Sequence, residues 1–178
     1  MLTRVITNKD KDIMIPLFKG LVRPILEYGN VVWCPGLKRQ IQLIENVQRK
    51  FTKRIKGLSH LEYEERLQSL RLPSLTYRRF RGDLIETFKI LHDFYDPITT
   101  AKFFTLCRND NTRGHEYKLK VNHSNTNLSL KFFTNRIVKS WNNLPSEAVS
   151  VKTLNAFKNY IDNYFKDVIY SCDVDEMY

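Results

Sequence analysis

Apolar residues recur at helical spacing between residues 77 and 95, over about five turns. They are Tyr77, Phe80, Leu84, Phe88, Leu91 and Tyr95, each three or four residues after the last. Side chains at this spacing share one face of an α-helix, and such a helix is stabilised mainly by burying that face. Ser74 can cap its start, and Pro73 keeps the preceding helix from continuing into it. The stretch therefore predicts one long helix against which other elements must pack.

The same stretch contains Arg81-Gly82-Asp83, the tripeptide that integrins recognise in adhesion proteins. Integrin ligands present Arg and Asp on an exposed turn, pointing in opposite directions, and the interior of a helix cannot do this. Gly82 costs about 1 kcal/mol relative to alanine in a helix, so we expect another helix to approach closely there. We predict that the tripeptide is helical and that integrins are not partners.

Helical spacing also predicts most of the remaining structure. Ile13, Leu17, Leu21 and Tyr28 mark one face of a first helix, and a second spans 36–57 and ends at Gly57. A short helix follows from His60 to Leu70. We therefore expect a mainly α fold in two parts. A helical bundle covers 1–97, and a small α+β module covers 98–178, with a β-hairpin at 102–121, helices at about 128–141 and 153–168, and a frayed acidic tail.

Charge and cysteine content narrow the class of partner and compartment. The net charge is +10 and the isoelectric point about 9.6, which is typical of proteins that bind a polyanion such as nucleic acid. The three cysteines are widely spaced, which indicates a reducing, intracellular location, nuclear or cytoplasmic. No stretch approaches the roughly 18 apolar residues needed to cross a bilayer, so we expect no membrane partner.

Residues 36–57 are the strongest candidate for a nucleic-acid contact, with seven lysines and arginines against one glutamate. A ridge of five polar residues points away from Ile41, Ile44 and Phe51; its members are Lys38, Gln42, Arg49, Lys53 and Lys56. Cations on such a ridge can follow a phosphate backbone. An ordinary solvated face supported by a Glu45–Arg49 pair is the alternative. The predicted nucleic-acid-binding residues are Lys38, Arg39, Arg49, Lys50, Lys53, Arg54 and Lys56.

Two other groups of basic residues allow a structural interpretation. Between residues 97 and 139, cations mix with aromatic residues, which suits single-stranded nucleic acid, but the spacing of Phe133, Ile137 and Trp141 favours a core. The arginines at 78, 79 and 81 are interpreted mainly as ion-pair partners, for example Arg79 with Asp83.

No assembled catalytic, metal or cofactor site is evident. The string YIDN at 160–163 mimics a polymerase motif, but its second position is Asn163 and its spacing is that of an amphipathic helix. Cys107, His115 and His123 match no common zinc spacing and lack a fourth ligand. We expect no catalytic residue, no metal and no cofactor.

Four residue strings follow one another along the chain: LFKGLVRPILEYGNVVWCP, IENVQRKFTKRIKGLSHLEYEERLQSLRLPSLTYRRFRGDLIETFKIL, FFTL…TRGH and FFTNRIVKSWNNLPSEAVS…LNAFKNYID. In this order they resemble the C-terminal part of the reverse transcriptase polyprotein of jockey-like non-LTR retrotransposons, which are LINE-type elements. The resemblance runs from about residue 11 to 165. It departs locally at residues 34–37, where Cys-Pro-Gly-Leu stands in place of a frequent Asn-Pro-Tyr-Leu.

The resemblance implies a thumb-like bundle and a post-thumb module that follow the polymerase palm. The family's catalytic aspartates belong to the palm, so the chain is expected not to be an enzyme on its own. The implied function is that of a nucleic-acid-binding fragment of an RNA-directed DNA polymerase that holds an RNA or DNA template–primer duplex through its phosphates, with the palm as a further partner. A non-catalytic helical protein-interaction module, or a decayed retroelement fragment, is the alternative.

Overall fold

The computed structural model describes residues 6–35, 37–96, 98, 102–107, 115–122 and 126–173, and this part of the chain is mainly helical. The helices meet in two apolar clusters. One joins helices from the N-terminal part, and the larger one joins the central helix to elements from the C-terminal part. The expectation of a mainly α fold is confirmed.

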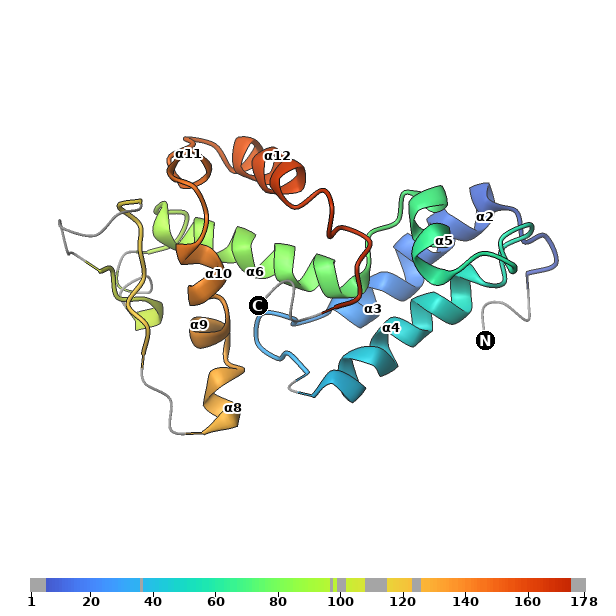
Figure 1. Ribbon diagram of the computed structural model, residues 1–178, viewed down its shortest axis with the longest axis horizontal. Coiled ribbons are helices and arrows are strands. Elements are labelled where there is room, and N and C mark those ends of the chain that lie inside the picture. The colour runs from blue at the N-terminus through green and yellow to red at the C-terminus, as the bar shows by residue number, and fades with distance from the viewer. Residues whose placement is uncertain are drawn as a thin grey trace.

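The central helix α6, Leu75–Leu91, runs through the middle of the molecule (Figure 1). It begins where predicted, because the Ser74 hydroxyl accepts a hydrogen bond from the Tyr77 backbone N–H at 3.0 Å. The predicted face is buried from Tyr77 to Leu91, whereas Tyr95 lies beyond the helix and is exposed. The larger apolar cluster is built on this face.

Arg81, Gly82 and Asp83 lie inside α6, so the predicted helical state of the tripeptide is confirmed. The close approach at Gly82 is also present, but its partner is a loop. A Cβ atom added there would lie 3.1 Å from Nδ2 of Asn30, in the loop after α3 (Arg23–Glu27). The glycine therefore gives this loop room against the central helix.

The N-terminal helical segment comprises α2, Lys11–Leu17, the π-helical turn η1, Phe18–Val22, and α3. Met14 and Phe18 face the smaller cluster and are fully buried. The face predicted from Ile13, Leu17, Leu21 and Tyr28 instead lies mostly toward solvent. This prediction is wrong because the spacing defines an apolar face without showing which side of the helix meets the core.

Helices α4, Lys38–Thr52, and α5, Tyr63–Leu70, complete the smaller cluster. A capping box starts α5, in which Glu62 and Glu65 each accept from the other's backbone N–H. α4 ends at Thr52 rather than at the predicted Gly57. The chain then makes tight turns that bury Ile55 and reach Gly57 at a φ of +81°.

The C-terminal part contains α8, α9, α10, α11 and α12. In Figure 1, α11 and α12 lie above α6, whereas α8 and α9 lie below it. In chain order, the bounds of these helices are Asn127–Leu130, Phe133–Arg136, Val138–Asn142, Ser146–Val149 and Leu154–Tyr164. The single helix predicted at about 128–141 is therefore broken into three. At the first break Phe132 is extended, and the freed Lys131 carbonyl accepts a hydrogen bond from Arg136 Nη1 at 3.0 Å.

The predicted helix at 153–168 begins as expected, since the Thr153 hydroxyl caps it, but it ends at Tyr164. The tail predicted to fray is held through residue 172. The Ser171 carbonyl accepts from the Ser74 hydroxyl at 2.6 Å, and Cys172 packs on the smaller cluster. The last residues of that tail, 174–178, lie outside the described part.

The expected β-structure of the C-terminal module is not supported. Within the described residues it is reduced to one antiparallel bridge between Leu106 and Leu119, and residues 108–114 of the predicted hairpin lie outside them. The side chain of Asn142 pairs with both the N–H and the carbonyl of Leu119 at 2.8 Å. A side chain of α10 thus takes the place that a neighbouring strand would occupy, and this part of the fold is helical.

Among the helices that the structure describes, none combines the length and the apolar character needed to cross a membrane.

Candidate nucleic-acid interface

All seven predicted nucleic-acid-binding residues are exposed. Lys38, Arg39, Arg49 and Lys50 project from α4, whereas Lys53, Arg54 and Lys56 lie in the turns that follow it. The ridge that was predicted on a single helix is wrong in its second half, because α4 ends at Thr52, before the last two ridge residues, Lys53 and Lys56. The structure places the seven cations on two adjoining elements. We call the surface that these seven residues form the α4 basic surface.

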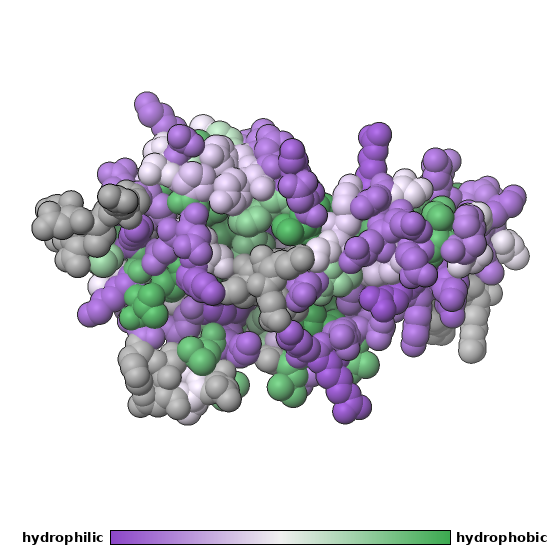
Figure 2. Space-filling view, viewed as in Figure 1, coloured by the Kyte–Doolittle hydropathy of each residue, from purple (hydrophilic) through white to green (hydrophobic). Residues whose placement is uncertain are grey.

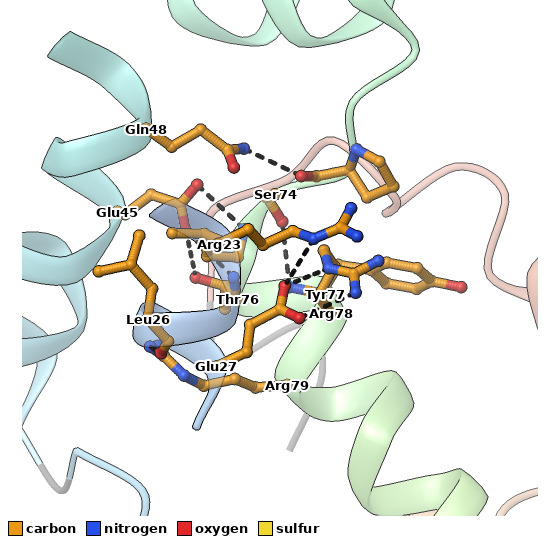
Figure 3. A network of polar contacts seen from close by, with 12 residues as sticks. Arg23, Leu26, Glu27, Glu45, Gln48, Ser74, Thr76, Tyr77, Arg78 and Arg79 are labelled. Atoms are coloured by element: carbon orange, nitrogen blue, oxygen red, sulfur yellow. Dashed lines mark hydrogen bonds and ion pairs between the residues drawn. The ribbon is translucent and has the colours of Figure 1, made fainter. Parts of the chain in front are cut away.

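The only acidic residue of this segment, Glu45, is buried against the start of α6. Its side chain is 3% exposed, and its two oxygens accept from the N–H groups of Leu75 and Thr76 and from the Thr76 hydroxyl, at 3.0–3.2 Å (Figure 3). The carboxylate thereby satisfies free N–H groups at the start of α6 and stabilises its positive end. The predicted Glu45–Arg49 pair on a solvated face does not describe this role.

Tyr63 connects the buried carboxylate to the basic surface. Its hydroxyl donates to Glu45 Oε1 at 2.5 Å, and the Arg49 guanidinium lies 4.8 Å from the centre of its ring. Burial, followed by the Glu45 charge, raises the pKa of Tyr63 far above its usual range, so the phenol keeps its proton. Arg49 therefore belongs both to the basic surface and to the packing of α4 on Tyr63.

A cation from another part of the chain joins this surface. The Lys56 N–H donates to the Lys9 carbonyl at 3.1 Å, which brings exposed Lys9 beside the turns after α4. Hydrophilic side chains crowd over the end of the molecule formed by α4 and α5 (Figure 2). Sequence reasoning missed Lys9 because no local pattern links it to residue 56.

The arginines of α6 serve the fold. Arg78 makes a two-pronged contact with Glu27 of α3 (Figure 3), and Arg81 makes one with Asp162 of α12, with nitrogen–oxygen distances of 2.5 and 2.7 Å. The hydrogen bond to Asp162, opposed by burial, raises the pKa of Arg81. Structural pairing is confirmed for Arg78 and Arg81, with partners from distant helices. The predicted pair of Arg79 with Asp83 is not supported, because Arg79 Nη2 donates to the Leu26 carbonyl at 3.2 Å and the Asp83 carboxylate accepts from Arg136. Asp162, in the string that mimics a polymerase motif, lies in a helix as predicted.

The second basic region divides between core and surface. Phe133, Ile137 and Trp141 are buried, as their spacing predicted. Arg136 is also buried and binds Asp83 through distances of 2.7 and 2.9 Å. Lys131 is exposed, as are Lys120 and Lys139 elsewhere in this region.

The zinc hypothesis gains no support. His115 is buried, its Nε2 lies 3.2 Å from the Trp141 carbonyl, and burial lowers its pKa. His123 is outside the described residues, and within them no three metal-binding side chains gather.

Comparisons with protein-family models, with curated proteins and with solved structures find no match to this chain.

Proposed function

We propose that this chain is a nucleic-acid-binding fragment of a non-LTR retrotransposon reverse transcriptase, in which the thumb-like part, 1–97, holds the template–primer duplex. The α4 basic surface would contact phosphates, and the post-thumb part would support it. The resemblance of residues 11–165 supplies the family.

One observation carries the proposal: the α4 basic surface has no acid of its own. Seven cations are exposed along residues 38–56, and the single glutamate of that stretch is buried against the start of α6. An ordinary solvated helix face mixes both signs of charge, because opposite charges support each other. A face of one sign repels itself and gains free energy when an anionic backbone releases its counterions.

The test replaces four of these cations, Lys38, Arg39, Lys50 and Lys53, by glutamine. Arg49 is kept, because its guanidinium stacks on Tyr63 and its loss would disturb the packing. If each of the four meets one phosphate, the slope of log K against log salt for blunt duplex becomes shallower by about 3.6. The loss should be nearly the same for different base sequences, since phosphate contacts carry no sequence information.

The matched control replaces four exposed lysines elsewhere by glutamine, namely Lys19, Lys102, Lys152 and Lys166. It removes the same charge and should change the slope much less. Equal losses in both variants would mean a diffuse charge effect, and no salt-dependent duplex binding by the wild-type chain would end the proposal. Circular dichroism checks that both variants stay helical.

We also propose that the chain does not polymerise by itself. Phosphoryl transfer needs carboxylates that hold paired Mg²⁺ ions, and Asp162 is taken up by Arg81 and by the Tyr77 hydroxyl. Primer extension by the purified chain with Mg²⁺ and nucleotides should stay at background. Extension that disappears in Asp162→Ala would refute this.

A second candidate, a protein-interaction module, is favoured by an apolar face on η1 and α3. Leu21, Ile25 and Tyr28 recur at helical spacing and are 50%, 75% and 82% exposed. In the proposed polymerase this face would contact the palm. In an independent interaction module it would contact another protein. Replacing Ile25 and Tyr28 by serine should leave duplex affinity unchanged under the first proposal. If the chain has no duplex affinity at all, the second candidate is preferred.

A further inference from the structure

A groove of about 250 Å³ lies between the first turn of α4 and the broken helices α8–α10. Ile41 of α4 and Leu130 of α8 contribute apolar side chains to it, and Cys34 lies in its wall. Lys131 and Lys139 also line it. The groove therefore joins two basic regions that lie far apart in the sequence, since Ile41 is one helical turn from Lys38 on the α4 basic surface.

Charge in the groove has one sign. The described residues that line it include Lys131, Lys139 and Arg136 and no acid. Arg136 is committed to Asp83 and to backbone carbonyls, so the two lysines, both exposed, are the cations available to a ligand. Apolar side chains beside lysines suit a nucleotide, whose base needs an apolar surface and whose phosphate needs a cation.

We infer that this groove holds the single-stranded extension of a nucleic acid whose duplex part lies on the α4 basic surface. The inference rests on the proposed function and deepens it, because it names the ligand as a duplex with an unpaired end. Lys131 and Lys139 would contact successive phosphates, while Ile41 and Leu130 would contact an unstacked base. The break between α8 and α9 places Leu130 and Lys131 at the groove.

The experiment compares a blunt duplex with the same duplex carrying a 5′ or a 3′ single-stranded extension of about six nucleotides. Two phosphate contacts on the single strand should steepen the salt slope by about 1.4, at about 0.7 for each. The advantage of the extended duplex should therefore shrink about sevenfold between 50 and 200 mM salt.

Replacing Lys131 and Lys139 by glutamine should abolish this advantage and leave blunt-duplex affinity nearly unchanged. The control variant Lys152→Gln with Lys166→Gln should retain the advantage. If blunt duplex binds but the extension adds nothing, or adds the same in both variants, the inference is wrong while the proposed function stands. If blunt duplex does not bind, the proposed function itself fails.

Cys34 provides a second readout in the unaltered protein. Its thiol is partly exposed at the groove, whereas Cys107 is partly exposed outside the residues that line it. Alkylation of Cys34, followed by peptide mass spectrometry, should slow when the extended duplex is present but not with the blunt one, with Cys107 as the internal reference. Unchanged labelling would refute the inference. Labelling that quickens when 174–178 are deleted would also overturn it, by assigning the groove to the chain's own acidic tail.

Discussion

Loss of either member of the Asp83–Arg136 ion pair should destabilise the whole molecule. The side chains are 1% and 5% exposed, and two nitrogen–oxygen distances of 2.7 and 2.9 Å join them. Arg136 also donates to the carbonyls of Asn30, Val31 and Lys131. One guanidinium thus ties together α6, the loop after α3 and the break before α9.

The expected magnitudes differ between the two partners. Asp83→Asn leaves a buried cation without its counter-charge, which costs about 3–5 kcal/mol. Arg136→Met leaves a buried carboxylate and also removes the donor from three carbonyls, each worth roughly 1–3 kcal/mol when left unpaired. Arg136→Met should therefore cost more than Asp83→Asn. The double variant should cost less than the sum of the two, because it leaves no unpaired charge.

Urea denaturation followed by circular dichroism measures these differences. Domains of this kind have only about 5–15 kcal/mol of stability, so the larger of these losses can unfold the protein. Arg136→Lys keeps the charge but loses the planar fork, and it should therefore lower the free energy of unfolding by less. Asp93→Asn is the matched control, since Asp93 is exposed and asparagine tolerates its φ of +56°. A cost below 1 kcal/mol for Asp83→Asn, or full additivity in the double variant, would refute this reasoning.

Three further predictions concern other parts of the fold. Gly82→Ala should stabilise α6 by up to about 1 kcal/mol in an Asn30→Ala background. In the wild type the gain should be smaller, because the new methyl group meets the tip of the Asn30 side chain. Thermal melts measure both effects. Burial holds the pKa of His115 below 6.5, so the unfolded chain takes up the proton at higher pH than the folded one. The free energy of unfolding should therefore fall as pH drops below about 6.5. His115→Gln should flatten this dependence in urea titrations. Glu45→Gln should cost about 1.5–3 kcal/mol in urea unfolding, whereas exposed Glu64→Gln should change little.

Periodicity predicted the elements whose apolar residues meet a core directly. The face of α6 from Tyr77 to Leu91, and the buried row of Phe133, Ile137 and Trp141, both appeared as expected. In these segments the spacing of large apolar side chains and the burial coincide, so local sequence is sufficient.

The buried face of α4 could not be predicted in this way. Ile41 and Phe51 are buried, but Leu37 and Val47, which stand at helical spacing with them, are 63% and 39% exposed, while Glu45 and Gln48 are buried. Gln48 Nε2 donates to the Pro73 carbonyl at 2.9 Å, and Glu45 caps α6. Polar residues become buried here because the start of another helix, distant in sequence, offers unpaired backbone groups.

The seven cations were found from composition, but their arrangement depended on where α4 ends. Thr52 closes the helix with its hydroxyl donating to the Arg49 carbonyl at 3.2 Å, and it accepts from Arg66 Nε at 3.3 Å. That second contact comes from α5, so no local signal before Gly57 marked the end of the helix. Lys53 and the cations after it therefore lie on turns. Phosphates that contact them would be arranged along these turns and not along a helix face.

The protein uses its two kinds of cation differently. Buried or paired arginines hold elements together through their planar fork. Arg136 binds a carboxylate and several carbonyls at once, whereas Arg78 and Arg81 each bind one carboxylate through two nitrogens. Arg66 donates to the Leu61 carbonyl and to the Thr52 hydroxyl. Lysines are strongly hydrated point charges and gain little from such sites. The 29 lysines and arginines of the chain therefore overstate the cations available to phosphates, because several of them are bound to carboxylates and carbonyls inside the fold. Replacing the exposed lysines proposed to contact phosphates should accordingly flatten the salt slope more than the same number of changes among these four arginines, whose loss would first appear as lower stability.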